Sequence, residues 1–89
     1  MSNEVSMEKV IEILKQNVVG LDKINIEAET PLISSGLVES IDFIEILCVI
    51  EREFDVKLQL DMLDFANLEN AKLISIMISD AISQKEKVG

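Results

Sequence analysis

The segment between residues 40 and 54 constrains the fold more than any other part of the sequence, because its apolar residues repeat with a helical period. Its core-facing residues are Phe43, Ile46, Leu47, Ile50 and Phe54. An α-helix turns once every ~3.6 residues, so this spacing gathers these side chains on one face. We therefore predict a helix over 40–54 that packs through this face against other helices.

Two more segments show the same period, one on each side of this helix. The segment 6–19 has the apolar stripe Met7, Val10, Ile11, Leu14 and Val18. The segment after Asn70 has the stripe Leu73, Ile74, Met77, Ile78, Ala81 and Ile82. Gly20 is a residue at which the first of these helices can stop, and the Asn70 side chain can cap the start of the last one. The sequence thus predicts three longer helices.

The connections predict one long loop and one short helix. Pro31 and the Ser34-Ser35-Gly36 run interrupt any helix over 21–39, so we expect an ordered loop anchored by its apolar residues. These anchors are Ile24, Ile26, Leu32, Ile33 and Leu37. Between 56 and 69 the pattern favours one helical turn around 61–65, with a short strand over 56–60 as the alternative. We expect one all-α domain over 1–89, a four-helix bundle with an ordered core over about 6–83 and frayed ends.

The charge and the missing residue types argue against several functions. The chain has 17 acidic and 8 basic residues and a net charge of −9, which disfavours binding to nucleic acid. It has no histidine, and its single cysteine, Cys48, cannot form an internal disulfide. We expect no catalytic residues, no metal site and no enzymatic activity. The absence of signal-peptide character and of a long apolar segment predicts a cytoplasmic protein without membrane insertion.

Ser40 is the candidate site residue, because it stands where a glycine-containing turn meets the helix 40–54. The first turn of a helix has unpaired backbone N–H groups and a partial positive charge, and both favour a phosphate group. The alternative is structural, since serine is also a preferred N-cap residue. A capping box on Ser40 would need Glu or Gln at position 43, where the sequence has Phe43.

The helix 40–54 also carries apolar residues away from its core-facing side. Ile41, Ile44 and Cys48 lie on another face, among acidic residues. An apolar patch with a rim of one charge sign is typical of a surface that binds a partner, and the alternative is the solvated side of an amphipathic helix. We interpret Cys48 as a small apolar residue rather than a reactive thiol. We call the following set the docking face: Glu39, Ile41, Asp42, Ile44, Glu45, Cys48 and Glu51.

The stretch ETPLISSGLVESIDFIEILCVIEREFDVKL resembles the acyl and peptidyl carrier proteins. In that family a loop ending Gly-Leu-x-Asp-Ser-Leu leads into the second helix, which ends in Glu-Phe. Here the corresponding residues are Gly36-Leu37-Val38-Glu39-Ser40-Ile41 and Glu53-Phe54. The resemblance extends over about 7–82, and it implies an acyl-carrier-like bundle with a long loop between its first and second helices. Glu39 and Ile41 depart from the usual Asp and Leu, so a transferase specialised for the common motif is expected to load this chain slowly.

The resemblance implies that Ser40 carries a 4'-phosphopantetheine arm taken from coenzyme A, with an acyl or aminoacyl group bound to the arm as a thioester. It also implies a set of partners: a phosphopantetheinyl transferase, an activating ligase, synthases and acyltransferases. These would act in fatty acid, polyketide or nonribosomal peptide biosynthesis and would contact the docking face of a monomer. The alternative is a helical adaptor that is not a carrier, which binds a basic partner through the helix 40–54 and uses Ser40 only as a cap.

Overall fold

The computed structural model describes residues 6–58 and 64–88, and within these ranges the chain is helical, with no strand. Its α-helices are α1 (Met7–Asn17), α2 (Ser40–Phe54) and α3 (Ala71–Val88). Two 3₁₀ turns, η1 (Leu21–Lys23) and η3 (Phe65–Leu68), lie between them. The prediction of an all-α fold is confirmed. The helical turn predicted around 61–65 falls mostly outside the described residues, and η3 begins at its last residue, Phe65.

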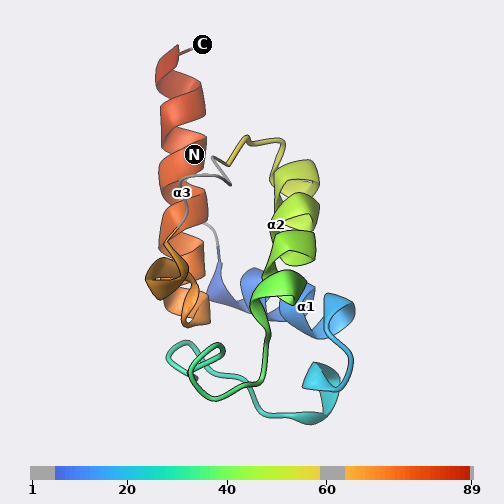
Figure 1. Ribbon diagram of the computed structural model, residues 1–89. Coiled ribbons are helices and arrows are strands. Elements are labelled where there is room, and N and C mark those ends of the chain that lie inside the picture. The colour runs from blue at the N-terminus through green and yellow to red at the C-terminus, as the bar shows by residue number, and fades with distance from the viewer. Residues whose placement is uncertain (1–5, 59–63, 89) are drawn as a thin grey trace.

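The three α-helices form one layered arrangement around a shared core (Figure 1). In Figure 1, α2 and α3 both run upward, and α1 crosses at the level of their lower ends, behind α2. α1 packs against both α2 and α3. The long connection from α1 to α2 passes beneath the lower ends of α2 and α3, and its last residues lead directly into α2. None of the helices in the described part of the chain is long and apolar enough to cross a bilayer.

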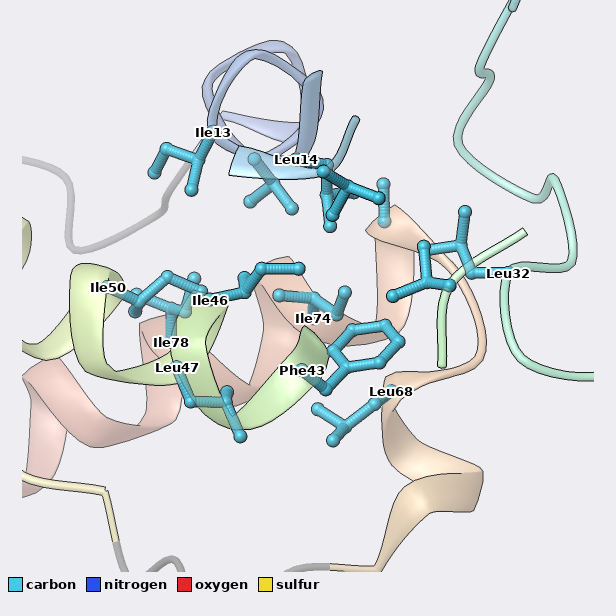
Figure 2. Packing of buried hydrophobic residues seen from close by; sticks show 14 of the residues in the cluster. Ile13, Leu14, Leu32, Phe43, Ile46, Leu47, Ile50, Leu68, Ile74 and Ile78 are labelled. Carbon is cyan, nitrogen blue, oxygen red and sulfur yellow. The ribbon is translucent and has the colours of Figure 1, made fainter. Parts of the chain in front are cut away.

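The predicted helix 40–54 has the same bounds in the structure. Its stripe is the centre of the core: Phe43, Leu47 and Ile50 have no exposed area, and Ile46 is 1% exposed. Figure 2 shows these side chains pointing toward those of Ile74 and Ile78 from α3 and Ile13 and Leu14 from α1. Burial of a large aliphatic or aromatic side chain contributes roughly 1.5–3 kcal/mol, so this stripe fixes the position of α2 in the molecule.

The buried stripe of α1 differs from the predicted one. Val10 and Leu14 are buried as expected, but Met7 is 41% exposed and Ile13, which the prediction left out, is 3% exposed. The physical reason is that α1 packs against two helices, so its buried face extends sideways to Ile13. Met7 is the first residue of the helix, capped by Ser6, whose hydroxyl accepts a hydrogen bond from the Glu8 N–H at 3.1 Å.

The start of α3 agrees with its predicted cap. The Asn70 Oδ1 accepts a hydrogen bond from the Leu73 N–H at 2.9 Å, which satisfies one of the free donors of the first turn. α3 continues to Val88, beyond residue 83, where the ordered core was expected to end. Among its buried residues is Ser75, which is 7% exposed and whose hydroxyl donates to the Lys72 carbonyl at 2.7 Å.

Candidate functional site

Ser40 is the first residue of α2 and is exposed to solvent. The N-cap position belongs to the preceding residue, Glu39, whose backbone is extended. The Glu39 N–H donates to the Asp42 Oδ2 at 3.4 Å, so the acidic residue at the third helical position completes the cap. The alternative that Ser40 serves as the N-cap is therefore wrong. That interpretation placed the N-cap one residue too late in the chain. It therefore looked for the acidic capping partner at Phe43, whereas the partner is Asp42.

The approach to Ser40 is a tight turn with buried ends. The Val38 N–H donates to the Leu32 carbonyl at 3.0 Å, and inside this turn the Gly36 N–H donates to the Ile33 carbonyl at 3.0 Å. Gly36 has a φ of 81°, a conformation that side chains with a Cβ rarely adopt. Leu32 and Val38 are 0% and 1% exposed. The chain thus enters α2 from a fixed point in the core, two residues before Ser40.

The serines near this turn differ in what their hydroxyls do. The Ser34 hydroxyl donates to the Glu69 carboxylate, and the Ser35 hydroxyl donates to the Pro31 carbonyl at 2.5 Å. The Ser40 hydroxyl makes no hydrogen bond to any other residue that the structure describes. It is therefore an exposed hydroxyl with no structural task, next to the free N–H groups of a helix start.

Most residues of the docking face are exposed on the outside of α2. Ile41 and Ile44 are 70% and 44% exposed, and Cys48 is exposed as well, so an apolar strip runs along the outside of α2. Glu39 and Glu45 are exposed beside this strip. Helical spacing predicted that these exposed residues lie on one side of the helix. In the structure they lie on the side of α2 that faces away from the core.

Two acidic residues of the docking face also have partners within the chain. The Asp42 carboxylate is half-buried and accepts from the Glu39 N–H. The Glu51 carboxylate is half-buried and accepts a hydrogen bond from the Leu58 N–H at 2.7 Å. Glu51 thereby holds the segment that follows α2 against the helix. Helical spacing alone could not reveal this contact, because the partner is a backbone group beyond the end of the helix.

A residue that contacts the loop before Ser40, and that the sequence did not indicate, is Glu69, which is half-buried between η3 and α3. Its carbonyl accepts from the Leu32 N–H at 2.7 Å. Its carboxylate accepts from the Ser34 N–H, at 3.1 Å to Oε1 and 3.2 Å to Oε2, and from the Ser34 hydroxyl. No local pattern could have indicated this residue, since its partners lie about 35 positions earlier in the chain.

The chemistry available at Ser40 is that of an acceptor. The chain has no histidine to act as a base, and the described residues contain no cluster of His, Cys, Asp and Glu that could hold a metal ion. The hydroxyl is exposed, and a phosphate on it would lie at the positive end of the α2 dipole. The residues around Ser40 therefore fit a covalently attached phosphate ester.

Residues 8–72 match the family described as phosphopantetheine attachment site (PP-binding). This range covers well over half of the chain, and the protein belongs to this family. The resemblance to carrier proteins is thus confirmed, as is the predicted cofactor, because members of this family attach a 4'-phosphopantetheine group. The protein is a phosphopantetheine carrier, and such carrier domains are generally not catalytic themselves. No curated protein and no solved structure matches the chain.

Proposed function

We propose that this protein is an acyl or aminoacyl carrier in which Ser40 bears the 4'-phosphopantetheine arm and the docking face of α2 binds the partner enzymes. One observation supports the choice of Ser40 most directly. Within the matched range 8–72 the serines are Ser34, Ser35 and Ser40. The first two hydroxyls are engaged with Glu69 and Pro31, whereas the Ser40 hydroxyl has no partner among the described residues.

Each residue around Ser40 has a separate role in the proposed carrier. Ser40 supplies the oxygen of the phosphate ester, and the bound arm supplies a terminal thiol that holds the cargo. The first turn of α2 places backbone N–H groups near the ester. Glu39 and Asp42 close the cap without using the Ser40 hydroxyl, so the ester forms without breaking a hydrogen bond of the fold.

The docking face supplies recognition. Exposed Ile41 and Ile44 offer apolar area at the start of α2, close to Ser40 in sequence and on the helix surface. Glu39 and Glu45 surround this area with negative charge. A partner with a basic rim and an apolar centre fits such a surface, and the charges accelerate its association. The partners we propose are a phosphopantetheinyl transferase, an activating ligase, synthases and acyltransferases. The carrier itself has no catalytic role and acts as a monomer in the cytoplasm.

Loading of the full chain tests the proposal. The protein is incubated with coenzyme A and a broad-specificity phosphopantetheinyl transferase, and its intact mass is measured. We expect a mass increase of one phosphopantetheinyl group, no increase for Ser40→Ala, and the full increase at completion for the control Ser35→Ala. A mass increase that persists in Ser40→Ala would show that the arm is attached to another residue. A wild-type chain that accepts no group from any transferase, including those encoded near its gene, would favour the adaptor function instead.

A further inference from the structure

The segment that leads into α2 is attached to a distant part of the chain through one residue, Glu69. Three groups of the segment bind it: the Leu32 N–H binds its carbonyl at 2.7 Å, and the Ser34 N–H and hydroxyl bind its carboxylate. We call this set of contacts the Glu69 clamp. A hydrogen bond to a charged acceptor is about twice as strong as a neutral one, so the carboxylate contacts form the stronger part of the clamp.

The clamp continues to Ser40 through the backbone. The Leu32 carbonyl accepts from the Val38 N–H at 3.0 Å, which closes the turn over 33–37. Val38 is buried, and the next two residues are the N-cap Glu39 and Ser40. The Glu69 carboxylate binds Ser34 inside this turn, and the turn leads through Val38 to the start of α2. The carboxylate therefore acts on the direction in which the backbone enters α2 through its contacts with Ser34. The turn over 33–37 ends three residues before Ser40 in the chain.

We infer that Glu69 is a positioning residue for the modification of Ser40: its carboxylate holds the turn over 33–37 in the arrangement in which the transferase can use the hydroxyl. This inference rests on the proposed function. The core residues of α2 hold the helix in place without Glu69, since Phe43, Leu47 and Ile50 are fully buried. Loss of the carboxylate thus removes the contacts to Ser34, keeps the backbone hydrogen bonds of the turn, and leaves the helix formed.

Steady-state loading kinetics distinguish positioning from two other roles of Glu69. We expect Glu69→Ala to lower kcat for phosphopantetheine transfer about 3- to 10-fold with little change in KM, because a misplaced acceptor affects the reaction more than binding. If Glu69 only attracted a basic partner, KM would rise and kcat would stay constant. If it only stabilised the fold, Tm would fall while both constants stayed constant below the transition. Either of these results would overturn the inference.

Two further variants separate geometry from charge. Glu69→Gln keeps an acceptor oxygen for the Ser34 N–H and removes the charge, so it should restore most of the kcat lost in Glu69→Ala. Ser34→Ala removes one contact of the clamp and no charge, so it should lower kcat by a smaller factor and have no further effect in a Glu69→Ala background. The control Glu29→Ala removes an exposed acidic residue from the same loop and should leave kcat unchanged.

The outcomes for the clamp and for the carrier function are distinct. If the wild-type protein accepts no phosphopantetheine group, the proposed function is contradicted. If the wild type loads normally, full kcat in Glu69→Ala would contradict only the role of Glu69. Additive effects of Glu69→Ala and Ser34→Ala on kcat would do the same. Far-ultraviolet circular dichroism at the assay temperature confirms that each variant is folded. If Glu69→Ala is unfolded, the inference is tested by the kcat values of Ser34→Ala and Glu69→Gln instead.

Discussion

The two faces of α2 are built from similar residues but occupy opposite environments. On one face Phe43, Leu47 and Ile50 have no exposed area, whereas on the other Ile41 and Ile44 are 70% and 44% exposed. Isoleucine occurs on both faces, so residue type does not determine which face is buried. The buried face is the one that packs against α1 and points toward Ile74 and Ile78 of α3 (Figure 2), and the exposed apolar face has acidic neighbours. The difference teaches that apolar residues in this helix serve folding on one side, and that the same residue types on the other side are free for the recognition that we propose.

The largest effect is expected on the buried face. Phe43→Ala should lower the free energy of unfolding by about 3–5 kcal/mol, because it leaves a cavity among Leu32, Leu68 and Ile74. Since a domain of this size has a total stability of only about 5–15 kcal/mol, urea unfolding should start at much lower denaturant concentration. Ile46→Val is the milder companion, with an expected loss of about 0.5–1.5 kcal/mol. Unchanged midpoints for both variants would contradict the assignment of this face to the core.

The exposed face should respond in the opposite way. Ile41→Ala should change the free energy of unfolding by less than about 0.5 kcal/mol, since the side chain is mostly in solvent. It should raise the KM for phosphopantetheine loading by about 10-fold, which corresponds to about 1.4 kcal/mol of lost binding. Urea unfolding and loading kinetics on the same sample measure both quantities. A loss of stability without a change in KM would show that Ile41 belongs to the folding side of the helix.

Substitutions of two acidic residues of the docking face test the same comparison between folding and binding, and their expected effects on stability and KM are smaller. Glu51→Ala should cost about 1 kcal/mol of stability, because it leaves the Leu58 N–H without its acceptor. Glu45→Ala, on an exposed residue without such a contact, should leave stability unchanged and raise KM a few-fold. This KM effect should shrink at high ionic strength, where exposed charges are screened. If the two variants behaved alike in unfolding, Glu51 would have no role in holding the segment after α2.

The sequence allowed good prediction wherever the deciding contacts are local. The bounds of the helix 40–54 and the Asn70 cap agree with the structure because period and capping involve residues only a few positions apart. The cofactor followed from the residues around Ser40 and their resemblance to a family. Ile13 was missed because two packing partners widen the buried face of α1. Glu69 was missed because a contact across about 35 positions leaves no periodic signal.

The assignment of the N-cap shows a different kind of error. Serine is a preferred cap and glutamate is a weak one, so propensity favoured Ser40 over Glu39. In the structure Asp42 compensates, by accepting the Glu39 N–H three residues earlier in the chain. The error therefore came from judging one residue at a time, whereas the cap is formed by a pair.

That pair has a consequence for the life of the molecule in the cell. Glu39 and Asp42 complete the helix start by themselves. The fold therefore does not depend on whether the neighbouring Ser40 hydroxyl is free or modified. With the arm on Ser40, as we propose, a newly made chain can therefore fold before the arm is attached, and a chain that loses the arm by hydrolysis keeps the same fold.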